Sequence, residues 1–218
     1  MESFRSGQDL SRTSESDQGA LEKKIAELEN EKGLLEWHIE YLEEQHGIDF
    51  LTGAKTRPVF ERELERALKL IRGEIEEHRT HSEPLKEVSL IFVDLDHFKD
   101  INDTYGHPVG DEVLQRVSAL LISSVRDTDV VARVGGEEFV VLLRGADEAV
   151  AARDAEDFRA KISNMTFEKR PDLHITASFG VTSSKHMRDA RALYESADQA
   201  LYAAKNSGRN QVVIAEKV

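Results

Sequence analysis

Two short acidic sequences in this chain have the residue types and spacing of a divalent-cation site. In the first, Asp94 and Asp96 end an apolar run that begins at Val88. Successive side chains of a strand alternate between its faces, so a strand here would place both carboxylates on one side. Magnesium takes oxygen ligands and is usually held by one or two carboxylates together with phosphate oxygens. Acids that cap a helix or lie in a solvated loop give the same pattern, and both interpretations stay open at this point.

The second acidic sequence, Glu137 and Glu138, follows a Gly-Gly pair that separates two apolar runs. Such a pair predicts a β-hairpin with a type I′ turn, and acidic residues beside a turn are often simply solvated. If this hairpin pairs with the strand that begins at Val88, the two carboxylate groups meet at one edge of the sheet. That arrangement suits metal-assisted phosphoryl transfer. Gly135 and Gly136 would let phosphates or a base approach the backbone closely.

Two further pairs of polar residues could bind a nucleotide. Asn102 and Asp111 offer an amide and a carboxylate, which suit the hydrogen-bonding edge of guanine. Asp111 is also well placed to cap the helix that follows it. Lys205 and Arg209 stand four residues apart at the end of a predicted helix. They either complement the helix dipole or bind phosphates.

The elements that must position these residues follow from the apolar periodicity. We expect, in order, a helix over 58–78, a strand over 88–94, a helix from 109 or 111 to 125, strands over 130–134 and 139–143, a helix over 147–165, a strand over 174–182, a helix over 188–205 and a strand over 211–215. This order predicts an α/β sandwich of the βαββαβ kind, in which helices flank a sheet of mixed strand directions.

Six motifs occur in a fixed order along the chain: Asp49-x-Leu-Thr-Gly53, Asp94-x-Asp-x-Phe-Lys99-x-x-Asn102-Asp, Gly106-His107-x-x-Gly110-Asp111, Arg133-x-Gly135-Gly136-Glu137-Glu138-Phe139, Ser178-Phe-Gly180-Val and Ala203-x-Lys205-x-x-Gly208-Arg209-Asn210. This set resembles the GGDEF family, the diguanylate cyclases, in the variant spelled Gly-Gly-Glu-Glu-Phe. The resemblance covers residues 48 to about 215, which we expect to form one GGDEF domain over 48–218 with a nucleotidyl-cyclase-like fold.

The resemblance implies an enzyme that condenses two GTP molecules into cyclic di-GMP and releases two pyrophosphates, each domain supplying half of an active site. It implies two Mg²⁺ ions per active site, with Mn²⁺ as a possible substitute, held by Asp94, the Leu95 carbonyl, Glu137 and Glu138. Glu137, Glu138 and Lys99 are the expected catalytic residues, Glu137 as a proton acceptor from the 3′-hydroxyl. The positions that match the family's GTP-binding residues are Phe98, Lys99, Asn102, His107, Asp111, Lys205 and Arg209.

A second ligand site is implied by Arg126-x-x-Asp129, which matches the family's inhibitory Arg-x-x-Asp motif. Arg126 would pair with a phosphate of cyclic di-GMP and Asp129 with a guanine, although a surface ion pair would have the same pattern. Asp157 stands where the partner helix often carries an arginine, so Arg153 is the remaining candidate on that helix. A non-catalytic cyclic di-GMP receptor and a scaffold with a GTP-binding head are the alternative functions.

The segment 19–47 has the heptad pattern of a coiled coil. Leucines recur every seven residues, and isoleucine or lysine stands at the intervening core positions: Leu21, Leu28, Leu35 and Leu42, with Ile25, Lys32 and Ile39. This mixture favours a parallel two-stranded coiled coil and hence a homodimer. A single amphipathic helix packed on its own domain is the alternative.

Composition limits the remaining possibilities. The chain has 218 residues, a net charge of −13 and no cysteine, which excludes a disulfide scaffold and a thiolate zinc site and argues against nucleic-acid binding. No apolar run is long enough to cross a membrane, and the N-terminus lacks the apolar region of a signal peptide, so we expect a cytoplasmic protein. Residues 1–18 are predicted to be disordered, with contact to an unknown regulatory partner as their possible role.

Overall fold

The computed structural model describes residues 21–35, 38–39, 41–42, 47–76, 84–185, 187 and 189–216. The chain divides into two compact units, 1–46 and 47–218. Residues 21–35 are helical, as the heptads predict, whereas the tail over 1–18 lies outside the described residues. Within the described part of the chain, no helix is long and apolar enough to cross a membrane.

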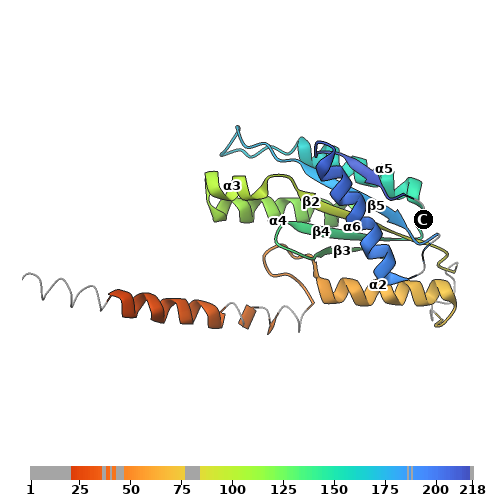
Figure 1. Cartoon of the computed structure of the whole chain (residues 1–218), viewed down its shortest axis with the longest axis horizontal. Coiled ribbons are helices and arrows are strands. Elements are labelled where there is room, and N and C mark those ends of the chain that lie inside the picture. The colour runs from red at the N-terminus through yellow and green to blue at the C-terminus, as the bar shows by residue number, and fades with distance from the viewer. Residues whose placement is uncertain are drawn as a thin grey trace, which may run out of the picture. The chain divides into compact units, whose positions relative to one another are not determined.

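The second unit is built on a six-stranded sheet in the order β1-β3-β4-β2-β5-β6 (Figure 1). The central strand β2 is antiparallel to both neighbours, and the outer pairs β1–β3 and β5–β6 are parallel. The predicted sheet of mixed strand directions is therefore confirmed. The strands are β1 (Lys55–Thr56), β2 (Val88–Leu95), β3 (Val130–Arg133), β4 (Glu138–Arg144), β5 (Ala177–Ser183) and β6 (Val212–Ile214).

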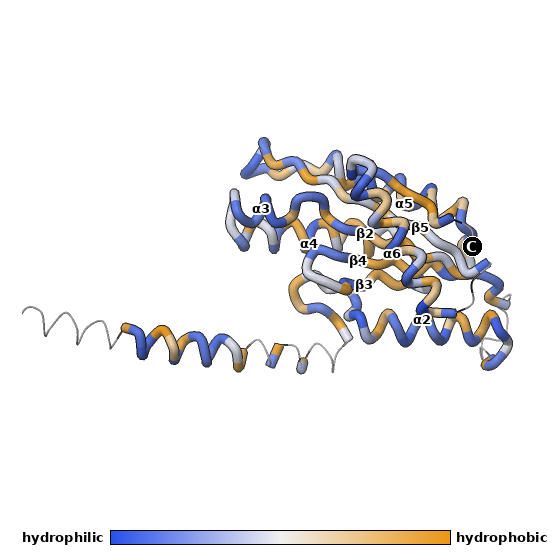
Figure 2. The backbone as a smooth tube through the Cα atoms, viewed as in Figure 1, coloured by the Kyte–Doolittle hydropathy of each residue, from blue (hydrophilic) through white to orange (hydrophobic). Residues whose placement is uncertain are grey.

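Helices cover both faces of this sheet, as an α/β sandwich requires. The helices are α2 (Arg57–Arg72), α3 (Phe98–Tyr105), α4 (His107–Ser124), α5 (Glu148–Ser163) and α6 (Ala190–Asn206). Apolar residues of α2 and α6 form one core with the sheet, and those of α4 and α5 form another on the opposite face. In Figure 2 the strands in the middle of the sheet are largely hydrophobic, whereas α2 alternates between apolar and polar residues.

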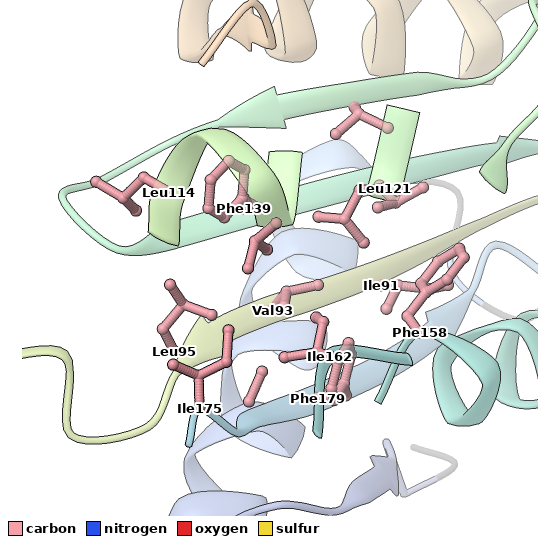
Figure 3. Close-up of a cluster of buried hydrophobic side chains, with 14 of the residues drawn as sticks. Ile91, Val93, Leu95, Leu114, Leu121, Phe139, Phe158, Ile162, Ile175 and Phe179 are labelled. Atoms are coloured by element: carbon pink, nitrogen blue, oxygen red, sulfur yellow. The ribbon is translucent and has the colours of Figure 1, made fainter. Parts of the chain in front are cut away.

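Strand β2 reads as a continuous apolar run because both of its faces are buried. Leu90 and Phe92 belong to the core shared with α2 and α6, whereas Ile91 and Val93 belong to the core on the other face. Figure 3 shows Ile91 and Val93 in this second core, together with Phe139 of β4. The alternation holds up to the end of the strand, so the residue at position 94 faces α6.

Two predicted helix boundaries were wrong. The helix expected over 58–78 ends at Arg72, because Gly73 adopts a left-handed conformation with φ of 72° and its N–H bonds to the Leu70 carbonyl. The last part of that prediction, residues 77–78, lies outside the described residues. The helix expected from 109 or 111 begins at His107, so Asp111 lies inside α4 and does not cap it.

The structure also contains elements that the periodicity does not predict, namely β1 and the short helix α3. The hairpin was predicted correctly, but its turn was not. Gly135 and Gly136 have negative φ angles, whereas a type I′ turn requires positive ones. Residues 134–137 form a longer loop, closed by a 2.9 Å hydrogen bond from the Val134 N–H to the Glu138 carbonyl.

Close packing against α6 explains the glycine of the motif Ser178-Phe-Gly180-Val. A Cβ atom at this position of β5 would lie 2.9 Å from Leu201 Cα and would also overlap the Ala197 carbonyl, both of which are backbone atoms of α6. Backbone cannot move aside as a side chain can, so any larger residue would displace α6. The glycine therefore sets the depth at which α6, and with it Lys205, lies on the sheet.

Candidate active site

The two acidic sequences meet at one edge of the sheet, as the topology predicted. Asp94 near the end of β2 lies directly opposite Glu138 at the start of β4. Asp94 is 5% exposed and Glu138 is half-buried. A Cβ atom on Gly135 would overlap the Glu138 carboxylate, so the first glycine of the loop makes room for that acid.

The buried Asp94 carboxylate is compensated by a cation from α6. Lys205 Nζ lies 2.7 Å from Asp94 Oδ2. Burial raises the pKa of Asp94 to about 6; Lys205 opposes the rise, and the charges of Glu137 and Glu138 add to it. Among the described residues, the ion-pair partner of this desolvated carboxylate is thus Lys205, the lysine to which the family resemblance gives a role in phosphate binding.

The loop that carries Glu137 is held from both sides. The Glu137 carbonyl accepts a 3.4 Å hydrogen bond from the Leu95 N–H, which places the loop beside the end of β2. Arg133 donates to the Gly136 carbonyl from Nε at 3.0 Å and from Nη2 at 2.7 Å. Its Nη1 bonds to Asp49 Oδ2 at 3.0 Å. The contacts of Arg133 with Gly136 and Asp49 were not predicted, although Arg133 and Asp49 lie in two of the six motifs.

Asp96 differs from Asp94 although both are buried on the same side. Its carboxylate accepts hydrogen bonds from Thr176 Oγ1 at 2.7 Å, from Ser178 Oγ at 2.6 Å and from the Asn210 N–H at 3.0 Å. These neutral donors satisfy the acid without a cation. Among the described residues, no group of three or more His, Cys, Asp or Glu side chains is arranged to hold a metal ion.

The predicted guanine-reading residues are brought together by helix packing. Asn102 of α3 lies against Gly110 of α4, where a Cβ atom would overlap the Asn102 side-chain oxygen. Asp111 is the next residue along α4 and is exposed. The half-buried Asn102 amide therefore lies against the turn of α4 that carries the exposed Asp111, and His107 is exposed at the start of the same helix.

The start of α3 supplies backbone donors beside the carboxylates. The first residues of a helix have no intrahelical partner for their N–H groups, which applies to Phe98 and Lys99. His97 precedes them in a left-handed conformation with φ of 56°, which turns the chain sharply from β2 into the helix. Phe98 is buried, Lys99 is exposed, and Arg209 is exposed in the turn after α6.

Two contacts from the segment between α5 and β5 stabilise α3 and α4, and neither was predicted. Arg170 Nη1 lies 3.0 Å from Glu112 Oε2, next to Asp111. Tyr105 Oη donates to Asp172 Oδ2 at 3.1 Å. Because these partners are more than fifty residues apart and polar, no short-range pattern could identify them.

Of the predicted product-binding residues, Asp129 is held in its own turn, whereas Arg126 and Arg153 are exposed. The Asp129 carboxylate accepts the N–H groups of Arg126 at 3.1 Å and Arg144 at 2.9 Å, so it fastens its own turn to β4. The Arg126 side chain is exposed. Arg153 lies on α5 with its side chain 75% exposed and Asp154 as its recorded partner. No contact between Arg153 and the Arg126–Asp129 turn is found among the described residues.

Comparison with known proteins agrees with this geometry. Residues 46–211 match the family described as diguanylate cyclase, GGDEF domain. Diguanylate cyclase DgcP of Pseudomonas aeruginosa is 35% identical over 197 residues, which is 90% of this chain and 28% of that protein. The crystal structure of the coiled coil and GGDEF domain of DgcB from Caulobacter crescentus, in complex with c-di-GMP, superposes with a TM-score of 0.69 at 30% identity, over 90% of this chain and all of that one.

A third relative is the diguanylate cyclase SiaD of P. aeruginosa, whose structure was solved with its activator SiaC. The match covers 95% of this chain and 76% of the SiaD chain, with a TM-score of 0.66 at 29% identity. The six-stranded sheet, with acidic residues where β2 ends and β4 begins, indicates a nucleotidyl-cyclase-like protein. The family match identifies which family of that class it is. This chain belongs to the GGDEF-domain diguanylate cyclase family. It spans 28–46% of the length of the curated relatives that it matches.

Proposed function

We propose that this chain is a diguanylate cyclase that condenses two GTP molecules into cyclic di-GMP and releases two pyrophosphates. The observation that carries the proposal is the half-site in which buried Asp94 faces Glu138 across β2 and β4, next to an unbroken Gly-Gly-Glu-Glu loop. In each of two equivalent steps, the 3′-oxygen of one GTP bonds to the α-phosphorus of the other. The bond from that phosphorus to pyrophosphate breaks, and the hydroxyl proton passes to a base, for which Glu137 is the candidate.

The residues present fit two divalent cations, Mg²⁺ or Mn²⁺, bound together with nucleotide. All the predicted ligands are oxygen donors: the Asp94, Glu137 and Glu138 carboxylates and the Leu95 carbonyl. Mg²⁺ usually takes only one or two protein carboxylates and completes its coordination with water and phosphate, so a preformed cage is not required. When bound, the cations neutralise charge on the α-phosphate and on the leaving pyrophosphate.

The chain's own residues would bind GTP at three points. Asn102 and Asp111 offer an acceptor and a carboxylate to the guanine edge, and His107 lies at the start of the same helix. The free N–H groups of Phe98 and Lys99 suit phosphate oxygens, as helix N-termini generally do. Lys99, Lys205 and Arg209 add cationic side chains to the triphosphate. In catalysis Lys99 would act only through its charge, since an ammonium group cannot accept the hydroxyl proton.

Because each domain supplies half of a site, the reaction requires two copies, and we propose that the arm brings them together. The stripe formed by Leu21, Ile25, Leu28, Leu35, Ile39 and Leu42 is 37–62% exposed in the single chain. Pairing two such stripes in a parallel coiled coil would bury them and tether the half-sites at high effective concentration. The alternative, a non-catalytic receptor, is less favoured because the acids of the half-site are all retained.

Purified protein incubated with GTP and Mg²⁺ tests the proposal directly. Wild type should form cyclic di-GMP and pyrophosphate, Glu137→Ala should form neither, and Glu168→Ala, which removes an exposed acid between α5 and β5, should match wild type. If a folded, dimeric wild type forms no product, residues 47–218 fused to a strong leucine zipper separate the remaining explanations. Activity of the fusion would indicate an arm held in an inactive register, and its absence would indicate a receptor.

We also propose feedback inhibition through Arg126, Asp129 and Arg153. Arg126→Ala should weaken cyclic di-GMP binding at least about tenfold, because a charge-assisted contact to phosphate is lost. Isothermal titration with cyclic di-GMP, and the ratio of initial rates with and without added product, check this expectation. Arg153→Ala examines the second helix separately. Equal product affinity in wild type and Arg126→Ala would contradict the assignment.

The tail over 1–18 remains a proposed contact site for a regulatory partner. SiaD, which resembles this chain over nearly its whole length, was crystallised with an activator protein. The cytoplasmic location expected from the sequence stays a prediction.

A further inference from the structure

The turn that follows α6 has an unusual backbone. Gly208, Arg209 and Asn210 have φ angles of 112°, 63° and 45°, so three consecutive residues are left-handed. Residues other than glycine adopt this conformation at a cost in conformational free energy, and they keep it only where the surrounding structure holds them. Arg209 carries a guanidinium assigned to the triphosphate, so whatever holds this turn also sets the direction of that group.

The first tether of the turn is Asp96. Its buried Oδ2 accepts the Asn210 N–H at 3.0 Å, and the same oxygen accepts Thr176 Oγ1 at 2.7 Å. Its Oδ1 accepts Ser178 Oγ at 2.6 Å. Asp96 is 5% exposed and therefore cannot exchange these donors for water freely.

The second tether acts on the side chain of the same residue. Asn210 Oδ1 accepts a 2.9 Å hydrogen bond from Arg159 Nη1 of α5. Arg159 is itself fixed by Glu156, at 2.9 Å from Nε to Oε2 and 2.6 Å from Nη2 to Oε1. The backbone of Asn210 is thus anchored by Asp96, directly after β2, and its side chain by Arg159 of α5, which over-determines its left-handed conformation.

We propose that Asp96 is a positioning residue, which fixes the left-handed turn after α6 and thereby directs Arg209 toward the triphosphate of GTP. The inference rests on the proposed function for the identity of that ligand. It divides the Asp-x-Asp motif into two roles. Asp94 has a lysine as its partner and is available to a cation, whereas Asp96 has its oxygens occupied by three neutral donors.

The two roles predict opposite effects of asparagine. In Asp96→Asn the amide oxygen can still accept from Asn210 and Thr176, while the amide nitrogen donates to Ser178, whose hydroxyl rotates to accept. Asparagine therefore keeps all three hydrogen bonds, and alanine loses them. If Asp96 were a metal ligand, the result would differ. Asp96→Asn would then also bind the cation more weakly than wild type, because the negative charge is lost.

The experiment measures three affinities of the full-length protein by calorimetry: for a non-hydrolysable GTP analogue with Mg²⁺, for guanosine, and for Mn²⁺ alone. Asp96→Ala should bind the GTP analogue about tenfold more weakly, as expected for a displaced charge-assisted contact. Its affinities for guanosine and Mn²⁺ should stay within about twofold of wild type, and Asp96→Asn should resemble wild type in all three. Arg209→Gln should cause a similar loss, and combining it with Asp96→Ala should add little to either single variant.

A loss of Mn²⁺ affinity in Asp96→Asn, or independent effects of Asp96→Ala and Arg209→Gln, would overturn the inference. If Asp96→Ala does not fold, Asn210→Pro takes its place. Proline removes the N–H that Asp96 accepts and cannot adopt the left-handed conformation. Position 210 is exposed, so the substitution does not disturb the core. Unchanged affinity of that variant for the GTP analogue would also overturn the inference. Failure of wild type to bind the analogue would instead contradict the proposed function, and this inference with it.

Discussion

Asp94→Asn is expected to stabilise the GGDEF domain and at the same time to abolish cyclic di-GMP formation. Burial raises the pKa of Asp94 from its ordinary value of 3.8 to about 6 in the folded chain. The folded chain therefore holds a proton between those two values while the unfolded chain has lost it, so the free energy of unfolding falls as the pH rises through that window. Above about pH 6 the full cost of the buried charge is present.

Asparagine has the same shape and no charge to desolvate, so the variant should gain about 1–3 kcal/mol in the free energy of unfolding at pH 7.5. The gain should vanish below about pH 4, where aspartate is protonated in both states. Urea titrations at the two pH values measure it. Product formation from GTP should fall by about a thousandfold or more, because the proposed site would lose a principal cation ligand.

Asp157→Asn is the matched control, because it neutralises an exposed aspartate paired with Lys161 on α5. A surface pair of this kind contributes little to stability, so this variant should resemble wild type in both measurements. Equal stability of wild type and Asp94→Asn at pH 7.5 would show that the buried carboxylate carries no such cost. Retained synthesis would remove Asp94 from the set of cation ligands.

The second large effect is expected from the arm. Replacing Leu28 and Leu35 together by glutamate places charges in the seam of the proposed coiled coil, and the protein should become monomeric. Without the tether, the half-sites would meet only at the concentration of free protein. Since a short tether gives an effective concentration in the millimolar range, turnover at sub-micromolar protein should fall by about a hundredfold or more.

Leu34 and Leu35 provide a matched pair for this experiment. They are adjacent leucines of similar exposure, 61% and 59%, but only Leu35 lies on the heptad stripe. Leu35→Glu should weaken dimerisation, and Leu34→Glu should not. Sedimentation equilibrium and initial rates over a range of protein concentrations measure both effects. Equal behaviour of the two single variants, or full turnover by a monomeric double variant, would refute the proposed role of the arm.

The site could be predicted from the sequence where short-range pattern and strand pairing determine it. The apolar run before Asp94 and the hairpin before Glu138 each have an unambiguous period, and their antiparallel pairing places the two acids opposite each other. The helix α3 escaped prediction because it has only eight residues, and Phe98 and Ile101 are its only buried ones. Eight residues are too few for a helical period to be visible.

The contacts that tune the site could not be predicted, because they join residues far apart in the sequence. Lys205 has the same local environment whether it complements a helix dipole, binds phosphate or pairs with Asp94, and only the fold distinguishes these possibilities. Asp111 looked like a helix cap because aspartate is common at that position, but α4 begins four residues earlier, at His107, with Pro108 in its first turn. Likewise, the type I′ turn was inferred from two glycines, whereas Gly135 has a negative φ and makes room for the Glu138 carboxylate.

The ion pair between Lys205 and Asp94 has a thermodynamic consequence for how the half-site fills. One ammonium group cannot neutralise both a buried carboxylate and an incoming triphosphate. In the proposed site, a Lys205 that turned to the nucleotide would leave Asp94 in need of a new positive partner, and a cation bound at Asp94 would release Lys205 for phosphate. Each ligand would thus lower the cost of binding the other, and by reciprocity the two affinities would rise by the same factor. The half-site should therefore fill cooperatively, with nucleotide and cation together.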